Sequence, residues 1–308
     1  MRIKGRIAAL AAAAMTAAAM MGTGVFASES LSAKDVLTKM TEAQKQEKCG
    51  KVSVDLNLKA GFEITGESEM TVGMSAKSSA VAEYDLRDGL TASVKADASV
   101  SAAGQNMSLK TETYAEKDGE EYKVYSKTAM DETEGEWEAT SVPAEEIEKL
   151  MAEYADSEAS LELFDKSGIE FESVLKDGEY ALTAELDGED VENIMNEAMK
   201  EASKQPEMQA AAAQASAATQ FLDGIKLDLV LTADAETFLP KEMTLDMKKS
   251  NLDKIGTLFA EGVGVEASDV KVTLEDAEVK AVYSFDETSV EIPDEAKGVE
   301  KTDAQAAA

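Results

Sequence analysis

The 308-residue sequence predicts an α+β fold in which one large, curved antiparallel sheet, a half-barrel, holds helices on its concave face. Apolar and polar residues alternate in about ten segments, which is typical of strands with one buried and one wet face. Short Lys-Asp-Gly turns at 117–119 and 176–178 leave no room for crossover helices, so neighbouring strands should be antiparallel. A sheet of this size does not stay flat, and we expect it to curl around the helices.

The first mature element is predicted to be a helix over about residues 32–48. Ser32 is its N-cap, Asp35 completes a variant capping box, and Gly50 stops it. Cys49 is expected at the end of this helix as a small, partly buried apolar residue. Strand patterns follow at 52–58, 70–74, 80–86, 90–100, 107–109 and 122–124.

Helices and strands alternate in the second half of the chain. Pro143 suits the first position of a helix that runs to about residue 154. Further helices are expected at 161–164, from Asp187 or Asp190 onward, at 209–222 and at 252–259. Strand patterns occupy 169–175, 180–186, 225–231, 243–247, 270–274 and 279–285.

The first 27 residues predict a signal peptide. Arg2, Lys4 and Arg6 form a positively charged start, and an apolar stretch follows. Val25 and Ala27 place small residues at the third and first positions before a cleavage site. We therefore expect cleavage after Ala27 and a protein that is secreted or held in the cell envelope. No cysteine follows the site to take a lipid, so no stable membrane anchor is expected.

The charge balance narrows the range of partners. The chain has 62 acidic and 30 basic residues and a net charge of −32 at pH 7. Such a charge repels nucleic acid and anionic lipid headgroups, so no nucleic-acid partner is expected. Its simplest interpretation is a solvated acidic surface. Because 44% of the residues are hydrophobic and regularly spaced, we expect a folded protein rather than an acidic tail.

The residue types exclude several kinds of chemistry. With no histidine and one cysteine, the chain has no Ser-His-Asp or Cys-His site and no histidine-ligated metal. Acidic turns at 85–89, 116–121 and 187–190 lack the spacing of an EF-hand, and turn chemistry explains them. We expect no catalytic residue, no cofactor and no metal site, and so a protein that is not an enzyme.

Three weak motifs carry a family resemblance. They are LSAKDVLTKM at 31–40, YKVY at 122–125 followed by GEW at 135–137, and YSFD at 283–286 leading to VEIPDEA at 290–296. The layout resembles the LolA-like and LppX/LprG-like lipoprotein-carrier superfamily, and is closest to a Gram-positive secreted branch of unknown function. The resemblance implies one LolA-like domain over 28–298, and the residues that follow it, 299–308, are expected to form a disordered tail. It also implies an apolar cavity that holds acyl chains or lipoproteins.

The function expected from these observations is binding of a lipid, an acyl chain or another hydrophobic ligand in an apolar cavity. Methionine lines adaptable apolar pockets, although core filling is its commoner role. The chain has 15 methionines, among them Met70, Met107 and Met130. The residues expected to line the cavity and to face the helices are Leu56, Leu58, Val94, Leu182, Leu229, Met243 and Leu245.

Two alternatives remain open. The chain could be a non-catalytic surface scaffold with a solid core, whose partners are proteins or cell-wall components. A cavity would distinguish the carrier from the scaffold. A hydrolase that uses two carboxylates is the weakest alternative, because nothing in the sequence selects a pair of acids.

Overall fold

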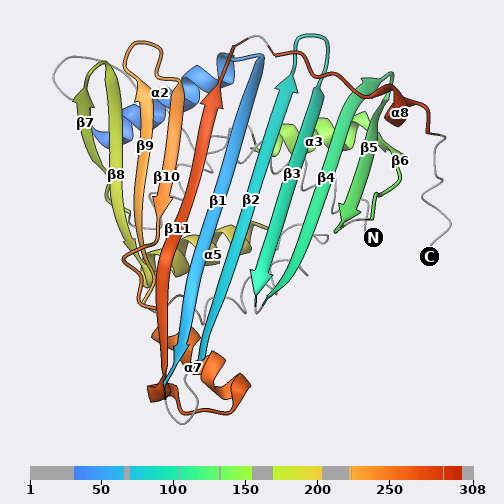
Figure 1. Cartoon of the computed structure of the whole chain (residues 1–308). Coiled ribbons are helices and arrows are strands. Elements are labelled where there is room, and N and C mark those ends of the chain that lie inside the picture. The colour runs from blue at the N-terminus through green and yellow to red at the C-terminus, as the bar shows by residue number, and fades with distance from the viewer. Residues whose placement is uncertain are drawn as a thin grey trace.

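Eleven strands form a single antiparallel sheet in the order β6-β5-β4-β3-β2-β1-β11-β10-β9-β8-β7 (Figure 1). The computed structural model describes residues 31–65, 70–102, 104–131, 133–154, 169–202, 222, 224–286 and 288–299. The predicted signal peptide, the helices predicted at 161–164 and 209–222, and the tail from 300 lie outside these residues, apart from Leu222.

The strands vary widely in length. Their bounds are β1 Cys49–Ile64, β2 Met70–Asp85, β3 Thr91–Ala102, β4 Gln105–Asp118, β5 Glu121–Met130, β6 Glu138–Pro143, β7 Glu172–Lys176, β8 Glu179–Asp187, β9 Lys226–Asp234, β10 Pro240–Asp246 and β11 Val270–Ser284. The helices are α2 Ala33–Gln46, α3 Ala144–Tyr154, α5 Gly188–Ala202, α7 Asp253–Val263, the short 3-10 helix η3 Ala267–Asp269, and α8 Asp294–Lys297.

Most predicted elements are present, and the differences have physical causes. The segments predicted separately at 70–74 and 80–86 are one strand, β2, which pairs with β1 along all 16 of its residues. Those at 270–274 and 279–285 are also one strand, β11, whose register shifts opposite Lys59 and Ala60. Helix α2 ends at Gln46, so Cys49 begins β1 instead of ending the helix.

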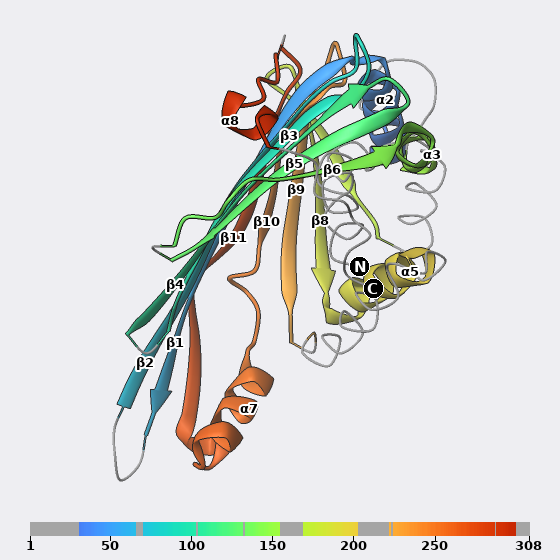
Figure 2. The same ribbon diagram turned by 90° about the vertical axis from the view of Figure 1, so that its right-hand side faces the viewer.

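The sheet is curved and open, and the helices α2, α3, α5 and α7 lie on its concave side (Figure 2). Helix α8 lies on the convex side, which the sequence did not predict. The α+β fold with one large, curved antiparallel sheet is therefore confirmed. Within the described residues, no helix is long and apolar enough to cross a membrane.

Separate apolar clusters hold the helices at the two flanks of the sheet. On one flank, Val36 and Met40 of α2 pack against Leu182 and Leu231 of β8 and β9. On the other flank, Ile147 of α3 is buried in a cluster of strands β3 to β6, namely Ala92, Ala115, Tyr122, Val124 and Val142. Burial of these side chains in water-free contacts supplies the main stabilising free energy of the fold.

Candidate ligand-binding face

The concave face of the sheet is almost free of charge. Strand alternation places every second residue on this face, and the register identifies which ones. On β1 and β2 the inward positions from Val52 to Ile64 and from Met70 to Tyr84 carry no charged side chain. In the described strands, only Lys117 near the end of β4 and Glu138 at the start of β6 bring a charge to this face. In a chain with 30% charged residues, such a face is suited to apolar contacts.

All seven predicted lining residues lie on this concave face, but in different surroundings. Leu182 is fully buried under α2, and Leu229 is buried in a cluster with Val191 and Ile194 of α5. The other five are half-buried; they are Leu56, Leu58, Val94, Met243 and Leu245. Leu182 and Leu229 therefore belong to the core beneath the helices, whereas the other five retain surface that a ligand could contact.

The described helices pack mainly on the two flanks of the concave face and on β11. Helices α2 and α5 pack on β7 and β8, α3 packs on β5 and β6, and α7 packs on β11. Between these flanks, the inward residues of β1 to β3 are half-buried over several positions, and many are small, such as Ala80, Ala96 and Ala98. We call this area, with Leu56 and Leu58 at its centre, the apolar trough.

The trough ends in a group of exposed apolar side chains. Five of the eight large hydrophobic residues exposed among the described residues belong to it, and we call them the open-end patch: Met70, Val100, Met107, Leu109 and Met130. They lie at the lower ends of β2 to β5, on the concave face. Figure 2 shows the lower ends of β1, β2 and β4 projecting away from α2, α3 and α5.

The sequence pattern did not predict this patch as a site. Three of its five residues, Met70, Met107 and Met130, are part of a methionine-rich composition that has no distinctive spacing. The available signal was the alternation itself, because it gives these methionines the same face as the trough. What the alternation does not show is that the described helices end before they reach this part of the sheet.

The cation on the concave face is already paired. Lys117 Nζ lies 2.7 Å from Glu148 Oε1 of α3 and 5.9 Å from the centroid of the Tyr122 ring. Hydrogen bonding to Glu148 raises the pKa of Lys117, so the side chain stays protonated. This ion pair fastens α3 to the end of β4 and leaves the rest of the described face without a cation.

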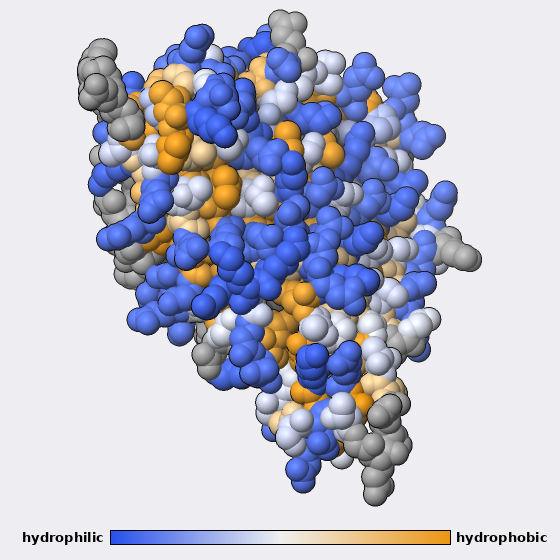
Figure 3. All heavy atoms as spheres, turned by 60° about the vertical axis from the view of Figure 1, so that its left-hand side comes forward, coloured by the Kyte–Doolittle hydropathy of each residue, from blue (hydrophilic) through white to orange (hydrophobic). Residues whose placement is uncertain are grey.

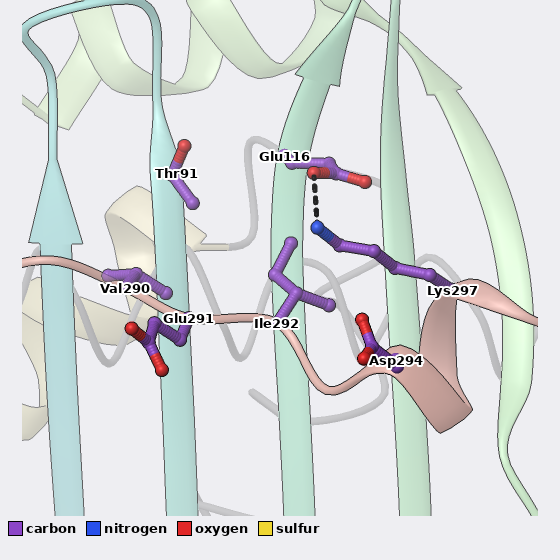
Figure 4. Close-up of a pocket in the computed structure, with 7 residues that line it drawn as sticks. All are labelled: Thr91, Glu116, Val290, Glu291, Ile292, Asp294 and Lys297. Atoms are coloured by element: carbon purple, nitrogen blue, oxygen red, sulfur yellow. Dashed lines mark ion pairs between the residues drawn. The ribbon is translucent and has the colours of Figure 1, made fainter.

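A second candidate lies on the convex face, under residues 288–299, which we call the C-terminal strap. Ile292 and Ala296 of the strap pack against Tyr114 and Tyr125, and Trp137 closes the cluster. A cleft of about 420 Å³ lies beside the strap (Figure 4). Its lining residues are Thr91, Glu116, Val290, Glu291, Ile292, Asp294 and Lys297.

Glu116 is the lining residue of this cleft whose interactions hold the strap to the sheet. Lys297 Nζ lies 4.0 Å from Glu116 Oε2, and Tyr125 donates a 2.9 Å hydrogen bond to Glu116 Oε1. Burial and this hydrogen bond raise the pKa of Tyr125 to about 12. Within the described part of the chain, no group of three or more acidic or cysteine side chains could hold a metal ion. The residues around the cleft therefore attach the strap to the sheet, through the Lys297–Glu116 ion pair and the apolar cluster.

The outer surface differs from the concave face. Seen from the β7–β8 side, hydrophilic side chains dominate and hydrophobic ones occur in small groups (Figure 3). Cross-strand ion pairs contribute to this surface, for example Lys51 with Glu83 at 3.1 Å and Lys280 with Glu242 at 2.8 Å. The convex side therefore carries cross-strand ion pairs together with the apolar cluster under the strap, whereas the concave side of the described sheet is almost free of charge.

Comparison with known proteins gives a family but no activity. Residues 32–298 match the model of DUF6612, a family of unknown function. No curated protein matches the chain.

Proposed function

We propose that this protein, which belongs to that family of unknown function, binds a hydrophobic ligand such as a lipid or an acyl chain along its apolar trough. The observation that supports this function is the nearly uncharged concave face, which ends in the open-end patch. Each methylene group that leaves water contributes about 0.8 kcal/mol, so burying half of a twelve-carbon chain contributes about 5 kcal/mol.

A LolA-like carrier fold and export from the cell, both expected from the sequence, fit this function. The open, curved sheet with helices on its concave side is compatible with a LolA-like carrier, in which such a sheet encloses the ligand. Export by a signal peptide cleaved after Ala27 would place the protein where lipids must cross an aqueous space. Without a lipid anchor it would act as a diffusing carrier.

Two neighbouring residues of β1 provide a matched test. Leu58 lies on the concave face and Asn57 on the convex face, so Leu58→Glu and Asn57→Glu add the same charge on opposite sides of the sheet. We expect the wild type and Asn57→Glu to bind the uncharged fluorescent probe N-phenyl-1-naphthylamine equally. Leu58→Glu should bind it at least tenfold more weakly, because a carboxylate in the trough must be desolvated by the ligand.

The control is the circular dichroism spectrum, which should be the same for the three proteins. A wild-type protein that binds neither the probe nor any lipid would contradict the proposal. That result would favour the alternative function, a surface scaffold with protein or cell-wall partners.

A further inference from the structure

Four residues of the open-end patch, all except Met70, form one continuous apolar surface. Met107 lies directly opposite Val100 across β3 and β4, and Leu109 lies directly opposite Met130 across β4 and β5. All four side chains are exposed on the concave face. Because a ligand in the trough would reach solvent here, its polar end is expected at this patch.

A carboxylate is fixed at the edge of this patch. Asp131 directly follows Met130, and its Oδ1 accepts a 2.8 Å hydrogen bond from the backbone N of Ser108, the residue between Met107 and Leu109. The Asp131 backbone N donates a 2.9 Å hydrogen bond to the Ser108 carbonyl in return. The first hydrogen bond therefore holds the acidic group of Asp131 at the backbone of Ser108, and the second holds the Asp131 backbone to the same residue.

The other charges nearby have the same sign or are turned away. Glu138 is the carboxylate that β6 brings to the concave face. Among the described residues of β4 and β5, the lysines nearest in register to the patch are Lys110 and Lys127, which lie on the convex face. Lys110 pairs there with Asp97 at 3.6 Å, and Lys127 lies opposite Glu112. Lys117, on the concave face, is bonded to Glu148. An anionic ligand group would therefore find the carboxylate of Asp131 at the edge of the patch, and the one cation on this face of the described strands, Lys117, is paired with Glu148.

We propose that the ligand is an amphiphile whose polar end carries a positive charge, an ammonium group that lies against Asp131 while the apolar chain follows Met130, Leu109 and Met107 into the trough. This inference rests on the proposed function and names its ligand class. A second copy of the chain is a poorer occupant of the patch, because each copy carries a net charge of −32. An anionic lipid is repelled for the same reason.

Three twelve-carbon amphiphiles test the sign of the charge. Dodecyltrimethylammonium, dodecyl maltoside and dodecyl sulfate have the same chain with a positive, an uncharged and a negative polar end. Each is titrated below its micelle concentration against protein that holds N-phenyl-1-naphthylamine. We expect the ammonium compound to displace the probe at a concentration at least about fivefold lower than the sulfate, and the ratio to shrink in 0.5 M salt.

A pair of variants separates the local carboxylate from the overall charge. Asp131→Asn keeps an oxygen for the Ser108 N–H and suits the positive φ of 52° at this position. Glu291→Gln removes one negative charge on the convex side, at the C-terminal strap. The preference is measured as the sulfate concentration that displaces the probe divided by the ammonium concentration that does so. We expect Asp131→Asn to reduce this ratio about two- to fivefold without changing maltoside binding. Glu291→Gln should leave the ratio unchanged.

The outcomes separate the two proposals. Equal displacement by all three amphiphiles, or an equal effect of both variants, would overturn the positive polar end and leave hydrophobic-ligand binding intact. Failure of all three amphiphiles would overturn both. Binding of a lysine-rich amphipathic peptide in their place, or dimer formation that Met107→Lys abolishes, would overturn the amphiphile in favour of a protein occupant.

Discussion

Met107 on β4 lies directly opposite Val100 on β3, and both side chains face solvent on the concave side, with exposed fractions of 61% and 45%. Facing apolar pairs normally stabilise a sheet because a second layer excludes water from them. No described helix packs on β3 or β4 beside this pair to provide that layer. The pair is therefore apolar surface available to a ligand.

Because Met107 is exposed, we expect its replacement to weaken ligand binding without lowering the stability of the fold. Met107→Ser should change the free energy of unfolding by less than about 0.5 kcal/mol, because the side chain already contacts water. The same variant should weaken binding of N-phenyl-1-naphthylamine several-fold. Urea unfolding and probe titration measure the two quantities, and a loss of stability above 2 kcal/mol would show that Met107 belongs to the core.

Leu182 is predicted to behave in the opposite way. It is fully buried between β8 and α2, in contact with a cluster that includes Val36 and Met40. Leu182→Ala should lower the free energy of unfolding by about 2–5 kcal/mol, because it leaves a cavity. Val174→Ala on β7, where the side chain is 53% exposed, is the control and should change it by less than about 0.5 kcal/mol.

Four tyrosines predict a loss of stability in alkali. Burial raises the pKa of Tyr84, Tyr114, Tyr125 and Tyr283 to about 12, above the ordinary value of 10. The unfolded chain therefore loses these protons first, so their contribution to stability is complete below pH 10 and is lost as the pH rises towards 12. Absorbance at 295 nm should show late ionisation of these groups together with unfolding. Ionisation of all seven tyrosines near pH 10 in the folded protein would contradict this prediction.

Gly135 is predicted to be required for the β5–β6 hairpin. A Cβ atom added at this glycine would lie 1.8 Å from the carbonyl oxygen of Thr128, which is far inside contact distance. Gly135→Ala should therefore lower the free energy of unfolding by more than about 1 kcal/mol. Gly73→Ala on β2 has open space around the added Cβ and should leave stability unchanged or raise it by up to about 1 kcal/mol. Thermal unfolding of the two variants would show the difference, and equal midpoints would contradict it.

The alternation of apolar residues predicted the strands and the inward face, but it failed where the chain departs from a period of two. The apolar positions of β11 are even-numbered from Val270 to Leu274 and odd-numbered from Ala277 to Tyr283, because a bulge shifts the register opposite Lys59 and Ala60. The sequence therefore looked like two strands. In β2 the residues between Met74 and Ala80 include no large apolar side chain, so the sequence pattern did not show that the two segments are one long strand.

The candidate site was predictable to a similar extent. The alternation placed all seven expected residues on one face, since that depends only on local pattern and register. It did not distinguish the buried Leu182 from the half-buried Leu58, because that difference depends on where α2 packs. The position of Asp131 beside Met107 depends on pairing between strands that the sequence pattern does not specify.

Native mass spectrometry of the protein, purified from a bacterial host without detergent, would detect a bound hydrophobic ligand directly. We expect a discrete extra mass that organic solvent removes and that is identified in the extract as an amphiphile with an apolar chain. The mass should be absent or reduced in Leu58→Glu and retained in Asn57→Glu. Ligand-free wild-type protein that also fails to bind N-phenyl-1-naphthylamine would contradict the binding of a hydrophobic ligand in the apolar trough.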